Sequence, residues 1–218
     1  NIWSQSPLTQ LSVGGIDKGF GIIDDFLTFD DENKWVLTQA TAGTVALDVA
    51  AKGGVLLLDS NSTTNNQGVQ VQLGGAAGAS SFIPSATSKI YYEARIKAAD
   101  IGSTTCQVFA GLAIVDTSVF ASAANSTANH IGYEAINSTA VGIHSEKAGT
   151  RSSTASAHTL VDDTYVKLGF VVDGLTSVTP FVNGVAKTAI TTNIPIVALT
   201  PSFVCHSSGT TDPILHVD

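Results

Sequence analysis

The amino-acid sequence predicts an all-β fold, an antiparallel jelly-roll sandwich of two large sheets. The clearest observation is the stretch YVKLGFVVDGLTSVTPFVNGV, residues 165–185, in which two runs rich in β-branched and aromatic residues flank Asp173-Gly174. This dipeptide and the closing Asn183-Gly184 tolerate the positive φ of tight hairpin turns. About a dozen such runs, at short spacing between Gly- and Asn-rich turns, are typical of a sandwich. The Cys…Trp…Cys pattern of immunoglobulin domains is missing, which favours a jelly roll.

Length and composition limit the class of protein further. A chain of 218 residues suits one large all-β domain, and 44 % hydrophobic residues are enough for a substantial core. No run of 18 apolar residues is present, so we expect no membrane span. The net charge is −8 and the ten basic residues are scattered. Because binding to phosphates needs clustered Lys and Arg, we expect no nucleic-acid partner.

The chain divides into two parts. Residues 1–23 are irregular and Gly-rich, which predicts an extended N-terminal arm, and residues 24–218 form the predicted sandwich domain. Such an arm is either a disordered tail or a segment that orders on a neighbouring subunit. In the second case Ile16, Phe20 and Ile22 are the candidate subunit contacts. The chain has no initiator Met and stops within an apparent strand, so we expect the full gene product to be longer.

The strands before residue 117 follow two patterns. GVQVQL (68–73) and KIYYEARIK (89–97) alternate apolar and polar residues, which predicts one buried and one wet face, with a surface pair between Glu93 and Arg95. QVFAGLAIVD (107–116) is apolar almost throughout, which predicts a central strand covered on both faces. Other strands are expected at WVLTQA (35–40), TVALDVA (44–50) and GVLLLDS (54–60).

The second half continues the series of strands. Residues 117–128 are small and polar, which predicts a long loop or a short helix. HIGYEAI (130–136) and AVGIHSEKA (140–148) are predicted to pair as a hairpin across Asn137-Ser138, and a polar loop follows at 149–163. The remaining strands are expected at VAKTAI, VALTPSFVCH and ILHVD.

The two cysteines, Cys106 and Cys205, lie in apolar runs. We interpret them as buried thiols that pack as small hydrophobic groups, although a disulfide between strands is an alternative that spacing alone does not test. We predict no cofactor and no metal site. Paired Asp residues (24–25, 30–31 and 162–163) could hold calcium, but roles in turns and caps are the preferred interpretation.

Two histidines and two glutamates near the middle of the chain are a candidate for acid–base or metal chemistry. If Asn137-Ser138 forms a two-residue turn, His130 and Glu134 lie on one face of the sheet, and His144 and Glu146 lie on the other. One compact cluster is therefore not expected. No Gly-x-Ser-x-Gly motif is present either, so the sequence predicts no catalytic residue.

Several segments resemble a known fold family. KIYYEARIK, GLAIVDTSVFA, NHIGYEA and YVKLGFVVDG with VTPFVNGV resemble the concanavalin A-like (laminin-G/laminarinase-like) jelly roll, and more specifically virion proteins of tailed bacteriophages in which such a domain decorates the capsid. The similarity covers about residues 24–218. It implies a non-enzymatic virion structural protein on the outer capsid surface. Its implied partners are the major capsid protein and copies of itself, with a homotrimer expected.

Two alternative functions remain open. A carbohydrate-binding module would bind glycans, including those of a host surface, through exposed aromatic rings, for which Trp35, Tyr91 and Tyr133 are the candidates. A degenerate glycosidase or alginate-lyase-like enzyme is the third possibility. Glycoside cleavage ordinarily needs two carboxyl groups, and laminarinase-like jelly rolls carry them in a Glu-x-Asp-x-x-Glu pattern that this chain lacks. The sequence therefore predicts that the protein is not an enzyme.

Overall fold

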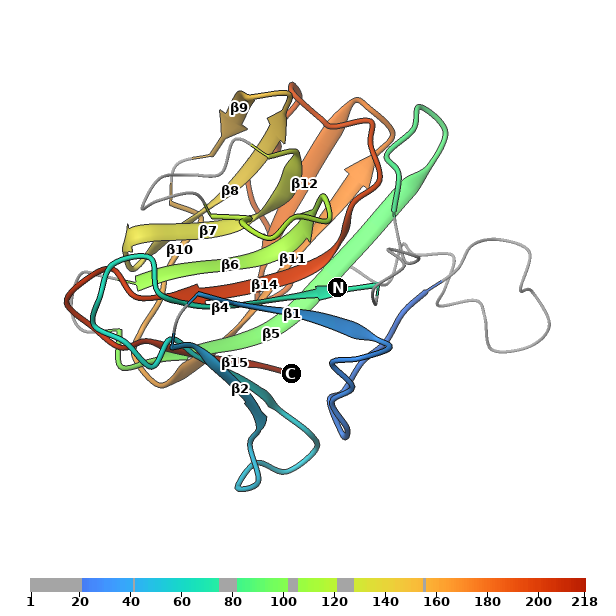
Figure 1. Ribbon diagram of the computed structural model, residues 1–218. Coiled ribbons are helices and arrows are strands. Elements are labelled where there is room, and N and C mark those ends of the chain that lie inside the picture. The colour runs from blue at the N-terminus through green and yellow to red at the C-terminus, as the bar shows by residue number, and fades with distance from the viewer. Residues whose placement is uncertain (1–20, 41, 75–81, 102–105, 121–127, 155) are drawn as a thin grey trace.

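The computed structural model describes residues 21–40, 42–74, 82–101, 106–120, 128–154 and 156–218. Within these ranges the fold is all-β, with two antiparallel sheets packed face to face (Figure 1), which confirms the predicted sandwich. The described residues include no helix of the length and apolarity that a membrane span requires.

The larger sheet has eight strands and the smaller sheet has seven. The larger sheet contains, in spatial order, β1 (Trp35–Ala40), β4 (Gly68–Leu73), β14 (Thr200–His206), β6 (Cys106–Ala113), β7 (His130–Ser138), β8 (Ala140–Lys147) and β10 (His158–Thr159), with β9 (Thr150–Ser153) paired to β8. The smaller sheet contains β13 (Val185–Ala186), β12 (Ser177–Val182), β11 (Thr164–Asp173), β5 (Lys89–Ala99), β15 (Ile214–Val217), β3 (Leu56–Asp59) and β2 (Thr44–Leu47).

The stretch from β11 to β13 folds as the sequence predicts. β11, β12 and β13 are consecutive antiparallel neighbours. Gly174 has φ 60° in the first turn, and Asn183 and Gly184 have φ 48° and 77° in the second. These left-handed conformations are the ones that Asp-Gly and Asn-Gly turns supply at low cost.

Strand β5 alternates as predicted, and its apolar residues form the inner face of the smaller sheet. Ile90, Tyr92, Ala94 and Ile96 are all buried. The expected surface pair between Glu93 and Arg95 is wrong, because each side chain binds a neighbouring strand or the chain end instead. Glu93 pairs with Lys167 on β11 at 3.2 Å, and Arg95 pairs with Asp218.

Strand β6 is central and buried along its whole length, as predicted. Strand β4 departs from the prediction, because its polar face is also buried. The Gln70 side chain donates to the carbonyl of Asp116 and accepts from the backbone N–H of Val119. Gln72 likewise binds the backbone of Ile114 and Asp116. The chain that follows β6 therefore folds back over the outer face of the larger sheet and covers β4.

Both cysteines are buried free thiols, as the preferred interpretation holds. The thiol of Cys106 donates to the carbonyl of Ser138, and that of Cys205 donates to the carbonyl of Pro213. Burial raises the pKa of Cys106 to about 12, so this thiol stays protonated and unreactive at neutral pH.

Residues 21–29 close one end of the sandwich. Phe26 is buried against Trp35, with ring centroids 5.5 Å apart, and the Asp24 carboxylate accepts hydrogen bonds from the Trp35 indole (2.8 Å) and the Phe26 backbone (3.0 Å). Asp24 thus holds the turn at Phe26 against Trp35. Of the predicted arm, residues 1–20 lie outside the described part of the chain.

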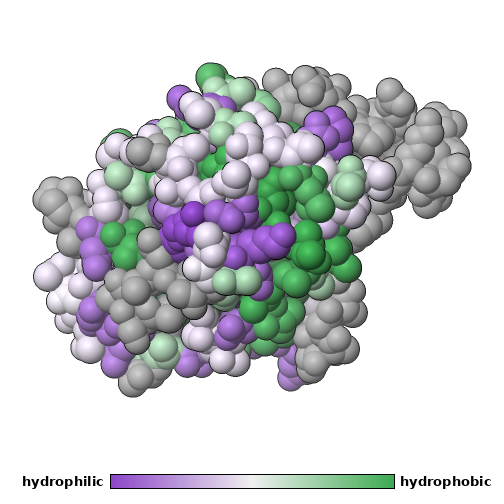
Figure 2. Space-filling view, turned by 90° about the horizontal axis from the view of Figure 1, so that it is seen from above, coloured by the Kyte–Doolittle hydropathy of each residue, from purple (hydrophilic) through white to green (hydrophobic). Residues whose placement is uncertain are grey.

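The surface is not uniformly polar. Figure 2 shows that, on the face seen from above, hydrophobic side chains gather beside a hydrophilic patch. At the other end of the molecule Ile23, Leu27 and Val49 are also exposed, by 94 %, 65 % and 98 %.

Candidate functional site

The pairing of β7 with β8 brings four titratable residues to one face of the larger sheet. His130 pairs with Glu146, and Glu134 pairs with Gly142. Residues directly opposite each other point to the same face, so the prediction that His130 and Glu134 lie away from His144 and Glu146 is wrong. β7 extends through Ser138, and its pairing with β8 is shifted by one residue from the expected register. A shift of one residue turns every side chain of a strand to the other face of the sheet.

Arg151 on β9 joins the two carboxylates. Its Nε lies 2.9 Å from Glu146 Oε2, and its Nη1 lies 3.0 Å from Glu134 Oε2. The Arg151 side chain is 20 % exposed, whereas those of Glu134 and Glu146 are only 1 % and 3 % exposed. One guanidinium therefore binds two buried carboxylates and covers them from solvent. We call this group the charged cluster; it consists of His130, Glu134, His144, Glu146 and Arg151.

His130 and Glu134 lie against each other at the buried side of the cluster. The Nδ1 atom of His130 lies 2.7 Å from the carbonyl oxygen of Ala128, which only accepts, so Nδ1 carries hydrogen. Its Nε2 lies 2.5 Å from Glu134 Oε1. Burial acts to raise the pKa of Glu134, but the hydrogen bond from His130 and the positive charge of Arg151 outweigh it and hold the pKa below the usual range.

His144 is neutral at physiological pH. Its Nδ1 lies 3.0 Å from Arg151 Nη1, which only donates, so Nδ1 accepts and the ring proton resides on Nε2. Burial lowers the pKa of His144 to about 4. Protonation would place a second positive charge against the Arg151 guanidinium, which acts in the same direction.

Aromatic side chains close the cluster from the other side. The Phe109 ring lies over Gly132, where an added Cβ would come within 2.6 Å of the ring, and packs edge-on against His130 with centroids 5.6 Å apart. Phe120 packs edge-on against Phe109. Chemically, the arrangement holds paired carboxylates beside a buried histidine. These groups are used in general acid–base catalysis, but here they are closed off by neighbouring side chains.

Two of the cluster's features have sequence signals. The i, i+4 spacing of His130 and Glu134 puts both on one face of a strand. Arg151 was missed because it falls in the segment interpreted as a loop, although Ala148-Gly149 between Glu146 and Arg151 is a hairpin signal; these residues have φ 49° and 77°. Among the described residues, no group of three or more His, Cys, Asp and Glu side chains is arranged to hold a metal ion.

The three rings proposed to contact glycans occupy different environments. Trp35 and Tyr133 are 3 % and 1 % exposed, so both belong to the core and neither offers a ring to a glycan. The Tyr133 hydroxyl donates to the carbonyls of Gly169 and Phe181 in the smaller sheet. Tyr91 is half-buried on the outer side of β5. The alternation in KIYYEARIK places Tyr91 on the polar face of its strand, whereas for Trp35 and Tyr133 the sequence pattern did not distinguish core from surface.

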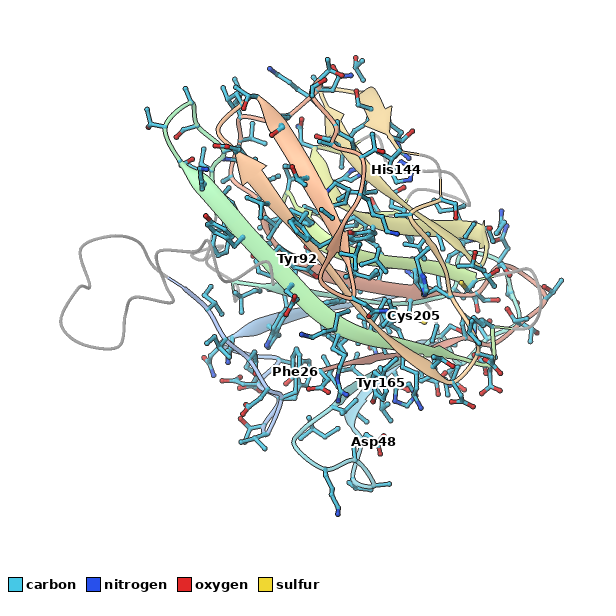
Figure 3. The ribbon with its side chains drawn as sticks, turned by 180° about the vertical axis from the view of Figure 1, so that it is seen from behind. Phe26, Asp48, Tyr92, His144, Tyr165 and Cys205 are labelled. Atoms are coloured by element: carbon cyan, nitrogen blue, oxygen red, sulfur yellow. The ribbon has the colours of Figure 1, made fainter. Side chains whose placement is uncertain are left out.

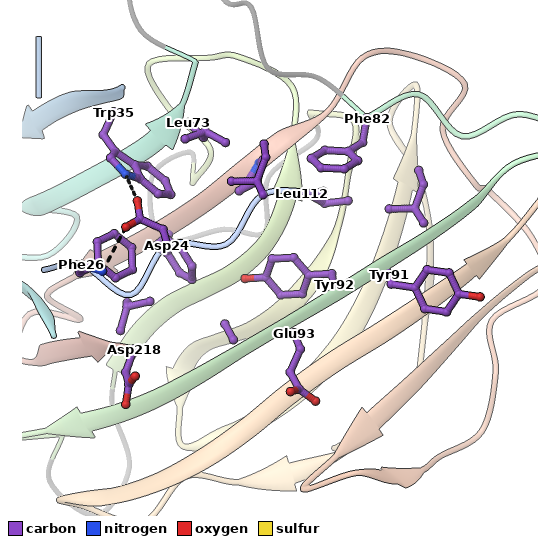
Figure 4. Close-up of a pocket in the computed structure, with 16 residues that line it drawn as sticks. Asp24, Phe26, Trp35, Leu73, Phe82, Tyr91, Tyr92, Glu93, Leu112 and Asp218 are labelled. Atoms are coloured by element: carbon purple, nitrogen blue, oxygen red, sulfur yellow. Dashed lines mark hydrogen bonds between the residues drawn. The ribbon is translucent and has the colours of Figure 1, made fainter. Parts of the chain in front are cut away.

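A pocket opens between the two sheets near the N-terminal end of the sandwich (Figure 4). Its volume is about 120 Å³, and its wall is mainly apolar. Ile22, a predicted subunit contact, lines this pocket and packs against the protein's own core, while Ile16 and Phe20 lie outside the described residues. We call it the aromatic pocket; its inward rings are Phe26, Trp35, Phe82, Tyr92 and Phe203.

Comparison with known proteins identifies the fold. No family model and no curated protein matches the chain. Among solved structures it is similar to the Bacillus licheniformis β-glucanase (14 % identity, 92 % of this chain and 95 % of that one, TM-score 0.59). It is also similar to the Emp47p carbohydrate recognition domain (9 %, 89 % and 90 %, TM-score 0.59). A third is the carbohydrate esterase vb_24B_21 of the Shiga toxin-encoding bacteriophage phi24B (14 %, 84 % and 88 %, TM-score 0.51). The fold is thus a concanavalin A-like jelly roll, shared with these proteins.

These similarities correct one prediction from the sequence. The missing Glu-x-Asp-x-x-Glu pattern led to the prediction that the protein is not an enzyme. Several of the similar structures are glucanases, including glycoside hydrolase family 16 enzymes of Bacteroides ovatus. The jelly roll of this chain is therefore one that carries catalysis in other proteins, and the prediction does not stand.

Proposed function

We propose that this chain is a surface protein of a bacteriophage particle, which decorates the outer capsid through contacts with the major capsid protein and with copies of itself. The observation that carries the proposal is the apolar surface beside the N-terminal segment. Ile23 and Leu27 are exposed by 94 % and 65 % on a segment that is fixed to the core by Phe26. A rigid segment with outward apolar side chains suits subunit contacts, and trimers are the expected form.

Two further features support this proposal. The resemblance of the strands to phage decoration domains covers the same residues that form the sandwich. The net charge of −8 also suits an outer surface, which should not attract nucleic acid.

The test is cosedimentation of the chain with particles assembled from its cognate capsid protein. We expect the wild-type chain to sediment with the particles and the double variant Ile23→Asp/Leu27→Asp to stay in the supernatant. Val185→Asp, which changes a residue 61 % exposed elsewhere, is the matched control and should still bind. Equal binding of all three proteins would contradict the proposal.

A carbohydrate-directed function is the second candidate, and the charged cluster favours it. Glu134 and Glu146 share one face of the sheet and one guanidinium. Paired carboxyl groups are what glycoside cleavage requires, and the similar structures include a mixed-linkage glucanase and an alginate lyase. Hydrolysis of mixed-linkage β-glucan or binding on a glycan array, lost in Glu134→Gln, would support this function. If the wild-type chain neither hydrolyses the glucan nor binds to the array, the carbohydrate-directed function is contradicted.

A further inference from the structure

The aromatic pocket contains a buried polar group that has no partner among the residues the structure describes. Tyr92 is 7 % exposed, and its hydroxyl makes no hydrogen bond to any of these residues. Figure 4 shows this hydroxyl directed into the space between the sheets, while the Tyr91 ring points the other way along β5. Burial raises the pKa of Tyr92, so the hydroxyl is neutral and offers both a donor and an acceptor. An unmet hydroxyl in a buried site costs free energy that a bound group could recover.

The other polar groups of the pocket are already engaged. The Asp24 carboxylate binds the Trp35 indole and Lys34, the latter at 2.9 Å. Glu93 binds Lys167 and Asp218 binds Arg95. The three carboxylates are thus paired with cations at the rim of the pocket. Among the described side chains that line the pocket, the Tyr92 hydroxyl is the polar group that a bound molecule could contact.

The volume and the polarity of the aromatic pocket together determine which molecules can bind in it. A dry apolar cavity of roughly 150 Å³ is known to hold a benzene ring, so about 120 Å³ with an open mouth suits one small ring. A water molecule needs two to four polar partners and would find one here. A sugar, with several hydroxyls, would leave most of them unpaired against Phe26, Trp35 and Phe203.

We propose that the aromatic pocket is a binding site for a phenolic ring, with the ring packed among Phe26, Trp35 and Phe203 and its hydroxyl bonded to that of Tyr92. The ring can belong to a free phenolic compound or to a tyrosine side chain. The site is separate from the charged cluster and does not depend on the proposed function.

The test is titration with p-cresol and toluene, followed by the fluorescence of Trp35. The background is Trp3→Phe, which leaves Trp35 as the only indole, since the chain has two Trp. We expect saturable binding of both compounds, with p-cresol bound about three- to tenfold more tightly because of one added hydrogen bond. In Tyr92→Phe the two affinities should become equal. Titration with N-acetyl-tyrosinamide distinguishes a free phenolic compound from a tyrosine side chain as the ligand. Binding of this compound indicates that the pocket accepts a tyrosine with its backbone attached, and no binding indicates that it accepts only a free phenol.

Ala94→Leu is the blocking variant. Ala94 lines the pocket and is 6 % exposed, so a larger side chain should fill the space and abolish binding of both compounds. If this variant is unfolded by circular dichroism, Ala94→Val replaces it. No saturable signal in the wild type, a p-cresol preference that survives Tyr92→Phe, or full binding in the filled variant would each overturn the proposal.

Discussion

At the end of the sandwich that contains His144, buried polar groups are bound to one another. At the end that contains Phe26, the buried hydroxyl of Tyr92 has no partner within the described part of the chain. Figure 3 shows His144 and Phe26 well separated on the molecule, with Tyr92 between them. In the charged cluster, Arg151 binds both Glu134 and Glu146. In the aromatic pocket the wall is apolar and open. The comparison teaches that the polar end is closed by its own side chains, while the apolar end is available for contacts with other molecules.

The largest expected effect comes from removing the cation that closes the polar end. Arg151→Ala leaves Glu134 and Glu146 buried without their shared partner, which should cost about 3–5 kcal/mol in the free energy of unfolding. Urea unfolding at pH 7 measures it. The matched control is Lys89→Ala, whose pair with Asp173 is about half exposed and should contribute about 0–1 kcal/mol. A loss in Arg151→Ala no larger than in the control would contradict a closed, mutually bound cluster.

Two buried tyrosines provide the next comparison. The Tyr133 hydroxyl donates to Gly169 and Phe181 and accepts from the Phe181 backbone, so Tyr133→Phe should destabilise by about 1–3 kcal/mol. Tyr92→Phe removes a hydroxyl without a partner and should leave stability unchanged or raise it slightly. Denaturant titrations of both variants check this contrast. Equal losses would show that Tyr92 has a partner in solution.

A smaller effect is expected from acid. The pKa of His144 is about 4 in the folded state, below the usual 6.5 that the unfolded chain retains. Between these two values only the unfolded state binds the proton, so stability falls as the pH decreases from 6.5 to 4 and the loss is complete below 4. From pH 7 to pH 5 the expected decrease is about 1–2 kcal/mol.

The variant His144→Gln isolates this contribution, because glutamine does not titrate. Its stability should depend less on pH over the same range, as measured by urea unfolding at each pH. His206, whose pKa burial also lowers to about 4, should retain its own share of the pH dependence in this variant. An unchanged pH profile in His144→Gln would show that His144 titrates normally.

Local patterns predicted the strands and turns well. The alternation of β5 correctly placed Ile90 and Tyr92 inside, and Asn183-Gly184 correctly marked a turn, because both depend on neighbours in sequence. The burial of Gln70 was not predicted. It depends on the segment after β6 folding back over β4, which is a tertiary contact with no local signal.

The charged cluster was missed for a related reason. Asn137 has φ 49°, and the turn it belongs to sets a register one residue away from the expected one. That single step moves His144 and Glu146 to the face of His130. The unpaired state of the Tyr92 hydroxyl among the described residues could not be predicted either. The sequence identifies a buried tyrosine but not the partners of its oxygen.

The most direct test of the account is the mass of the protein in solution, measured by light scattering over a dilution series. If the apolar end is the contact surface, the wild-type chain and Val185→Asp form the same oligomer, a trimer, and Ile23→Asp/Leu27→Asp is a folded monomer. One mass for all three proteins, whether monomer or oligomer, would contradict the claim that the molecule makes its contacts through this end.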